Sequence, residues 1–69
     1  MNPQLLRHLW TLVDRSQSSQ VLALDDNGLV HWLLEQFMVQ RPINQTETDQ
    51  LSQYIRTKLP LIRDLVQGP

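Results

Sequence analysis

The stretch from residue 44 to residue 66, NQTETDQLSQYIRTKLPLIRDLV, repeats apolar side chains at intervals of three and four. The repeating side chains are Leu51, Tyr54, Ile55, Leu59, Ile62, Leu65 and Val66. These intervals match the 3.6-residue period of an amphipathic α-helix. Asn44 and Glu47 have the spacing of a capping box, with Asn in place of the usual Ser or Thr. We therefore predict a helix over 45–67, which Gly68-Pro69 ends.

Pro60 lies inside this predicted helix. An interior proline costs about 3 kcal/mol and kinks a helix, because it has no N–H and its ring clashes with the preceding turn. The apolar phase nevertheless continues from Leu59 to Ile62 without a shift. We expect either one bent helix or two nearly collinear helices.

Two further helices are expected upstream, over about 3–16 and 26–40. Asn2-Pro3 is a strong start signal, since Asn caps well and Pro suits the first helical position. Asp25-Asp26 can cap the second helix and favours the positive end of its dipole. The apolar positions are Leu5, Leu6, Leu9, Trp10, Leu12 and Val13 in the first, and Leu29, Val30, Leu33, Leu34, Phe37 and Met38 in the second. The second should stop before Pro42, which disfavours the α conformation at Arg41.

Residues 17–24 do not show a clear period. The apolar residues Val21, Leu22 and Leu24 are too few to decide between a short helical turn and an extended connector that pins Leu22 and Leu24 on the core. Both conformations remain open from the sequence.

These elements predict an all-α fold, a single domain over 1–69. We expect a small bundle of three main helices, or four if the last is split at Pro60. A chain of 69 residues buries little surface and has no cysteine for disulfides or thiolate metal sites. Close helix packing and self-association are the remaining ways to gain stability.

Composition and motifs exclude several classes of function. The net charge of −1 provides no general electrostatic attraction to nucleic acid or acidic lipid. No apolar run is long enough to span a membrane. The absence of cysteine and of a secretory leader fits a cytoplasmic protein. No nucleophile elbow or phosphate loop is present, and His8, His31 and Glu35 do not form a metal motif. We expect neither an enzyme nor a cofactor.

Three basic residues near the end of the chain support an alternative function. Arg56, Lys58 and Arg63 form a local excess of positive charge on the predicted helix 45–67, partly offset by Asp64. DNA binding through this helix is therefore the second hypothesis. The other interpretation is that cations near a helix C-terminus complement the dipole.

Trp32 is the least expected apolar residue of helix 26–40. It lies roughly opposite the face centred on Val30, Leu33 and Phe37, and it shares one side with Val39, seven residues later. Aromatic residues are enriched at the centres of protein interfaces. We predict an interface that contains Trp32, Val39 and Glu35. The alternative is that residues 17–24 or the last helix cover Trp32 as part of the core.

Two segments resemble a family of short, uncharacterised helical proteins from cyanobacteria. They are residues 9–34, LWTLVDRSQSSQVLALDDNGLVHWLL, and residues 58–66, KLPLIRDLV. The resemblance covers most of the chain but brings no functional motif and no site residue. It implies a cytoplasmic accessory or regulatory protein.

The first functional hypothesis is a non-enzymatic protein-interaction module, an adaptor or small regulator that presents helical surface. We expect a protein partner, most simply a second copy in a homodimer formed through helix 26–40. The alternative is a DNA-binding regulator, and a subunit of a larger assembly is the third option.

Overall fold

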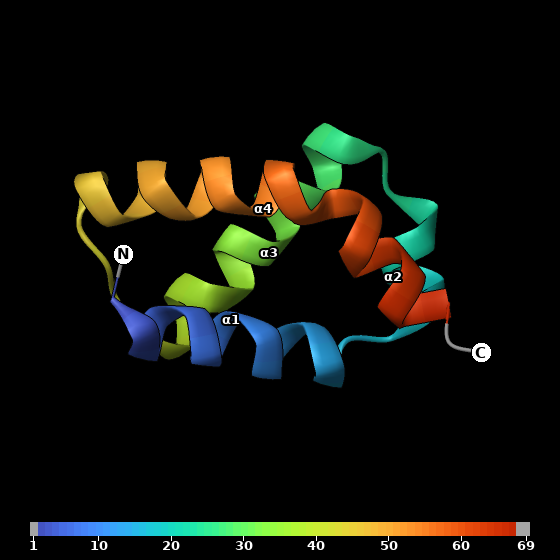
Figure 1. The fold of residues 1–69 in the computed structure, drawn as a ribbon, viewed down its shortest axis with the longest axis horizontal. Helices are drawn as coiled ribbons and strands as arrows, with labels where there is room; N and C mark the ends of the chain where they lie inside the picture. The colour runs from blue at the N-terminus through green and yellow to red at the C-terminus, as the bar shows by residue number, and fades with distance from the viewer. Residues whose placement is uncertain (1, 68–69) are drawn as a thin grey trace.

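The computed structural model describes residues 2–67, and this part of the chain is helical with no strand. The helices are α1 (Pro3–Arg15), α2 (Ser18–Ala23), α3 (Asp26–Gln40) and α4 (Gln45–Gln67). Figure 1 shows α1 and α4 side by side and running in the same direction, with α3 crossing behind them in the opposite direction. The predicted all-α bundle is confirmed. Gly68-Pro69, the predicted end of the last helix, lies outside the described residues.

The capping box at the start of α4 forms as the sequence predicts, with Asn in the capping position. The Glu47 backbone N–H donates to Asn44 Oδ1 at 2.8 Å, and the Asn44 N–H donates to Glu47 Oε1 at 3.2 Å. Two backbone donors that no helical carbonyl can reach are therefore satisfied reciprocally.

The other two predicted caps are also present. Asn2 Oδ1 accepts from the Gln4 N–H at 2.8 Å, and Asp25 Oδ1 accepts from the Gly28 N–H at 2.7 Å. A Cβ atom at Gly28 would lie only 2.8 Å from that Asp25 oxygen. A side chain at this position would thus push on the cap of α3, which accounts for the glycine.

Residues 17–24 form a short helix, so the first of the two open alternatives is correct. The N–H groups of Gln20 and Val21 both donate to the Gln17 carbonyl at 3.1 Å and start α2. Val21 is buried, whereas Leu22 is 41% exposed. Val21 therefore anchors this segment on the core and the partly buried Leu24 packs against it, whereas Leu22 does not.

α4 remains one helix through Pro60, and its ribbon bends over its last turns (Figure 1). Leu59 and Ile62, on either side of the proline, are buried, while Pro60 itself is exposed. Because Pro60 has no N–H, the carbonyl four residues earlier loses its usual helical donor. Burial of the flanking side chains holds the helix together across this gap.

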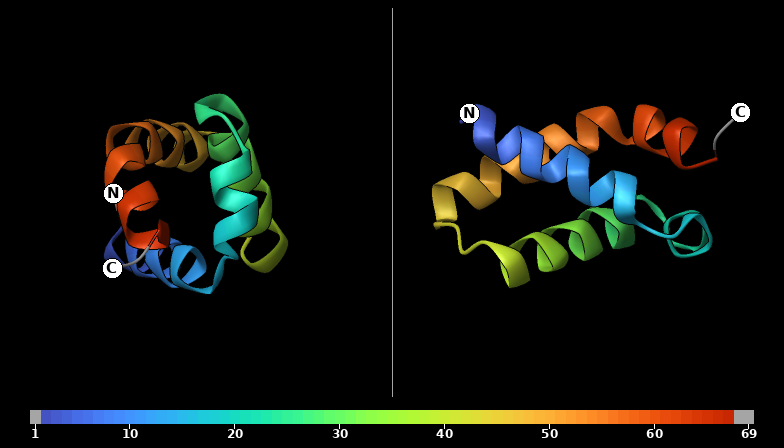
Figure 2. Two further views of the ribbon diagram at one scale, coloured as in Figure 1. Left: turned by 90° about the vertical axis from the view of Figure 1, so that its right-hand side faces the viewer. Right: turned by 90° about the horizontal axis from the view of Figure 1, so that it is seen from below.

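The core lies between α3 and the layer formed by α1 and α4 (Figure 2). Every buried side chain among residues 2–67 is hydrophobic. They are Leu5, Leu9, Leu12, Val13, Val21, Leu29, Val30, Leu33, Leu34, Phe37, Leu51, Ile55, Leu59 and Ile62. α3 supplies five of them and α4 four, so α3 is the central element of the bundle.

No helix within residues 2–67 combines the length and the apolar character that crossing a lipid bilayer requires.

Replacing Ile62 by Ala should lower the free energy of unfolding by about 2–5 kcal/mol, because a fully buried side chain leaves a cavity. Val39→Ala is the control, since Val39 is 81% exposed and its truncation should change stability by less than about 0.5 kcal/mol. Urea unfolding followed by circular dichroism measures both. Equal stability of the two variants would contradict the continuous buried stripe of α4.

Replacing Asp25 by Ala should lower the free energy of unfolding by about 1 kcal/mol, because the cap of α3 is lost. Glu35→Ala, at an exposed position in the middle of the same helix, removes the same charge without touching the cap. Thermal unfolding at neutral pH distinguishes the two. If Asp25→Ala unfolds at the same temperature as the wild-type chain, the hydrogen bond from Gly28 to Asp25 does not stabilise the start of α3.

Candidate functional site

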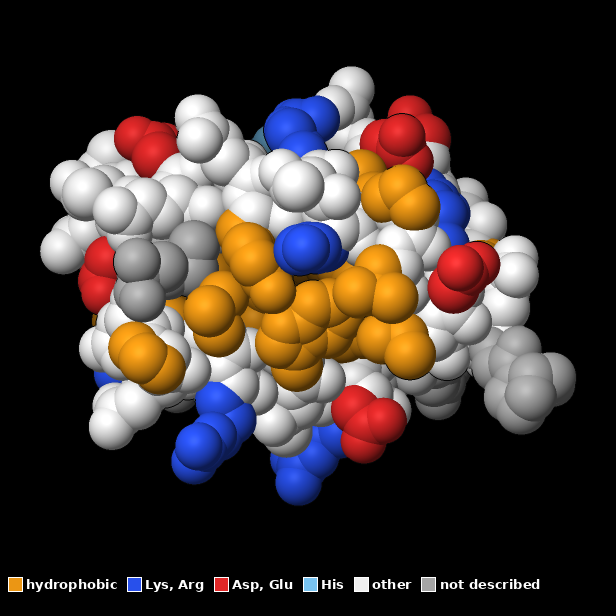
Figure 3. Space-filling view, in the orientation of Figure 1, with side chains coloured by type: hydrophobic (Ala, Val, Ile, Leu, Met, Phe, Trp, Pro, Cys, Tyr) orange, Lys and Arg blue, Asp and Glu red, His pale blue; other side chains and the backbone are white. Residues whose placement is uncertain are grey.

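Hydrophobic side chains gather on the face where α1 and α4 lie side by side, as Figure 3 shows. Leu61 is 46% exposed and Leu65 is 58% exposed, while Trp10, Tyr54 and Val66 are half-buried. We call these five residues the α1–α4 surface. Larger contiguous apolar patches on small domains commonly mark interaction sites.

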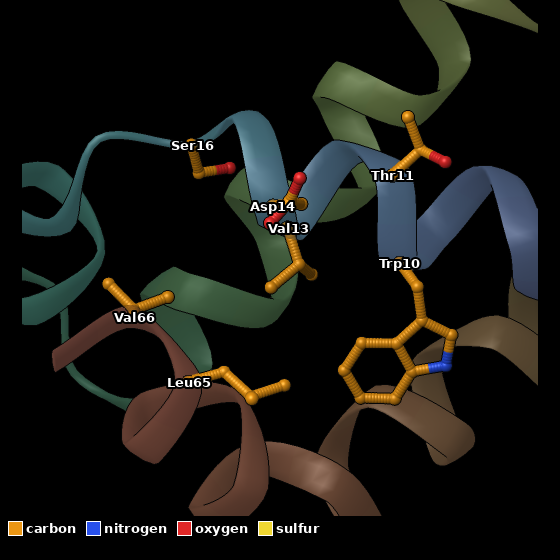
Figure 4. Close-up of a pocket in the computed structure, with 7 residues that line it drawn as sticks. All are labelled: Trp10, Thr11, Val13, Asp14, Ser16, Leu65 and Val66. Carbon is orange, nitrogen blue, oxygen red and sulfur yellow. The ribbon is translucent and has the colours of Figure 1, made fainter. Parts of the chain in front are cut away.

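Part of the α1–α4 surface is hollowed into a groove with a volume of about 470 Å³. It is lined by Trp10, Thr11, Val13, Asp14, Ser16, Leu65 and Val66. In Figure 4 the Trp10 indole extends from α1 toward α4, and Leu65 and Val66 come from the last turns of α4 on the other side of the opening. The groove is thus lined by four apolar side chains, two hydroxyls and one carboxylate, that of Asp14.

The surface arises because α4 carries further large apolar residues beside its buried stripe. The buried stripe is Leu51, Ile55, Leu59 and Ile62. Tyr54, Lys58, Leu61 and Leu65, spaced by four, three and four, follow one another along a neighbouring side of the helix. The buried stripe packs on the core, which leaves Leu61 and Leu65 of the second stripe exposed.

A contact with Tyr54 of α4 holds Trp10, one of the residues that line the groove. Trp10 Nε1 donates to Tyr54 Oη at 3.1 Å, and the rings meet edge to face with centroids 6.2 Å apart. Lys58 Nζ lies 5.9 Å from the centroid of the Tyr54 ring, within cation–π range. The indole is therefore held in place by a polar partner rather than by burial alone.

Charges of opposite sign flank Trp10 along α1. Arg7 and Asp14 are both exposed, and their separation of seven residues, two helical turns, puts them on the same side of the helix. Residues 2–67 contain one ion pair, between Arg63 and Asp26. Arg7 and Asp14 are thus free of ion pairs in the described part of the chain.

The predicted interface on α3 has a mixed character. Val39 is 81% exposed and Glu35 is exposed, but Trp32 is half-buried and packs against the core. Trp32 lies in a shallow hollow of about 280 Å³, lined also by Leu12, Arg15, Ser16, Gln17, Gln20, Gln36 and Gln40. The end of α1 and the start of α2 therefore cover part of the indole, and glutamines surround the rest.

The three basic residues of the DNA-binding hypothesis do not form one free patch. Arg56 Nη1 donates to Asn27 Oδ1 at 2.9 Å. Arg63 Nη2 donates to the Leu24 carbonyl at 3.0 Å and to Asp26 Oδ1 at 2.9 Å. Lys58 lies by the Tyr54 ring. Both arginines therefore tie α4 to the beginning of α3.

The two histidines lie apart from this surface. His8 is half-buried, meets Phe37 edge to face at 4.7 Å, and has a buried Nε2 without a hydrogen-bond partner among the described residues. His31 is exposed. Within residues 2–67, no three His, Asp or Glu side chains are placed to hold a metal ion.

Sequence reasoning did not predict the α1–α4 surface, because it assigned Trp10, Tyr54 and Leu65 to the core stripes. The available signal was Leu61, which lies outside the buried phase of α4 yet is apolar. Together with Tyr54 and Leu65 it completes a second helical stripe, which only the packing shows to be exposed.

Replacing Tyr54 by Phe should lower the free energy of unfolding by about 0.5–1 kcal/mol, because the Trp10 indole N–H loses its acceptor but stays partly accessible to water. Tyr54→Leu also removes the edge-to-face ring contact and should cost about 0.5–1.5 kcal/mol more. Urea unfolding at low protein concentration measures the series. A Tyr54→Phe variant as stable as wild type would show that the hydrogen bond does not hold the indole.

Comparison with known proteins identifies no relative, since no family model, no curated protein and no solved structure matches this chain significantly.

Proposed function

We propose that this chain is a non-enzymatic protein-interaction module, an adaptor, accessory or regulatory protein that binds another protein through the α1–α4 surface. The observation that carries the proposal is the exposure of Leu65, which lines the groove with Trp10, and of Leu61, which precedes it by one turn on the same side of α4. Exposed apolar side chains that gather into one patch are typical of surfaces that bind a partner. Trp10, which lines the groove with Leu65, is of a residue type enriched in interface hot spots.

The shape of the surface favours a protein partner over a small ligand. The stripe from Tyr54 to Leu65 covers twelve residues of helix, which are eleven steps of 1.5 Å or about 16 Å in length. The donors that line the groove are already used within the chain, because Trp10 donates to Tyr54 and the hydroxyls of Thr11 and Ser16 donate to carbonyls of α1. A long apolar strip between two helices suits the apolar face of another helix.

The face of α3 that contains Trp32, Glu35 and Val39 is the second surface considered for the same function. Trp32 contributes less to it than the sequence predicts, because part of its ring packs against the core. Val39 remains exposed, so this face provides one exposed apolar side chain. The α1–α4 surface provides two exposed apolar side chains, Leu61 and Leu65, and an adjoining groove, and we favour it for that reason.

DNA binding through α4 receives less support. Arg56 and Arg63 make intramolecular hydrogen bonds, and freeing them would loosen the contact between α4 and α3. The net charge of −1 supplies no general attraction to phosphates.

The proposed setting is the cytoplasm. A chain without cysteine does not depend on oxidising conditions for its stability. The resemblance to short cyanobacterial proteins is consistent with an accessory or regulatory role and stays a prediction.

Affinity capture from a native lysate tests the proposal. The immobilised wild-type chain and Val39→Gln should retain the same proteins, and a Leu61→Gln, Leu65→Gln double variant should lose them. Circular dichroism should show equal helical content, since all three positions are exposed. If the double variant still retains the captured proteins, the assignment to the α1–α4 surface is overturned. If Val39→Gln loses them, the binding site lies on α3 instead.

A further inference from the structure

The order of charges on α1 indicates what covers the α1–α4 surface. Arg7 and Asp14 lie on either side of Trp10, and the midpoint between them falls between Trp10 and Thr11. Two copies of α1 packed antiparallel about a two-fold axis at that midpoint bring position 7 of one copy opposite position 14 of the other. Each copy then offers a cation where the other offers an anion.

A parallel arrangement of the same two helices does the opposite. It would align Arg7 with the partner's Arg7 and Asp14 with the partner's Asp14, and like charges in contact oppose association. The charge order thus selects the antiparallel arrangement among the ways in which two copies could meet on this face.

The groove has the chemistry to receive an arginine side chain. Asp14 is its one carboxylate, and Trp10, Val13, Leu65 and Val66 are its apolar lining residues. An arginine can pack its aliphatic stem on such walls, stack its guanidinium on an indole and pair with a carboxylate. Arg7 is exposed and has no ion-pair partner within residues 2–67, so it is available for this role.

We propose that two copies of this chain pack face to face through their α1–α4 surfaces, with α1 antiparallel to its counterpart and Arg7 of each copy entering the groove of the other. There it pairs with the partner's Asp14. The two Trp10 side chains lie near the axis, and both copies bury Leu61 and Leu65. This dimer rests on the proposed function and specifies its partner as a second copy.

Helix direction within one copy supports face-to-face packing. α1 and α4 run in the same general direction (Figure 1) and cross each other (Figure 2), so a two-fold axis perpendicular to both makes each helix antiparallel to its counterpart. One symmetric contact can therefore cover the whole surface, and the burial it adds is what a chain of 69 residues without disulfides lacks.

Sedimentation equilibrium of the wild-type chain and charge-reversed variants tests the dimer. Arg7→Glu and Asp14→Arg should each raise the dissociation constant at least about tenfold, because each turns two attractive pairs into two repulsive ones. Mixing the two variants should restore association to within about threefold of wild type, since each pair in the mixed dimer joins opposite charges again. Neither substitution alters a buried residue, so both variants should fold. A loss of association that came from misfolding would not be reversed by mixing the two variants.

Arg15→Glu is the matched control. It makes the same change on the same helix, but Arg15 lines the hollow beside Trp32 instead of the groove. Its dissociation constant should stay within about threefold of wild type.

A wild-type chain that stays monomeric up to about 1 mM would overturn the dimer. If the double variant at Leu61 and Leu65 still loses proteins captured by wild type, a foreign partner uses the surface and the proposed function stands without the dimer. A wild-type dimer unaffected by both charge reversals, or one that mixing does not restore, would overturn the antiparallel arrangement.

Discussion

Burial of the apolar side of α3 against α1 and α4 is the interaction on which the rest of this structure depends. The chain has no cysteine, and among residues 2–67 the buried side chains are all hydrophobic. Phe37, the largest of the fully buried side chains, lies on α3. Stability must therefore come from apolar surface removed from water, at about 25 cal/mol for each Å² buried. The polar contacts that accompany it set the orientation of the helices.

Those polar contacts concentrate at the start of α3. Arg63 bonds to the Leu24 carbonyl and to Asp26, and Arg56 bonds to Asn27. The Arg63 side chain is 26% exposed and that of Asp26 is 70% exposed, so water screens the pair and its own contribution to stability is small. Together, the contacts of Arg56 and Arg63 align the middle and the end of α4 with the beginning of α3.

The packing of α1 and α4 on α3 also explains why the seam between α1 and α4 is not covered on its outer side. α1 and α4 both direct their buried stripes toward α3, and the seam between them is bridged by Trp10 and Tyr54 at one end. Toward the other end, the seam widens into the groove between Val13 and Leu65. A bundle in which one helix is buried between two others has no further helix to cover that seam. The function that we propose uses the surface that this arrangement leaves unpartnered.

Local sequence determined where the helices begin and end. Asn2, Asp25 and Asn44 cap helices as expected, and α3 ends before Pro42, because these effects act within one helical turn. Periodicity also predicted the buried stripe of α4 through Pro60. Of the candidate site residues, the sequence identified Val39 and Glu35 as exposed positions, and it left the environment of Trp32 open.

Only the tertiary structure decided which apolar residues face water. Leu65 continues the apolar phase of α4 but is exposed, Trp32 is half covered by the end of α1 and the start of α2, and Val21 alone anchors α2. Arg56 and Arg63, basic residues in the sequence, act as ties to α3. The physical reason is that helix periodicity ranks the sides of one helix by hydrophobicity. The number and lengths of the neighbouring helices then determine how much of each side is covered.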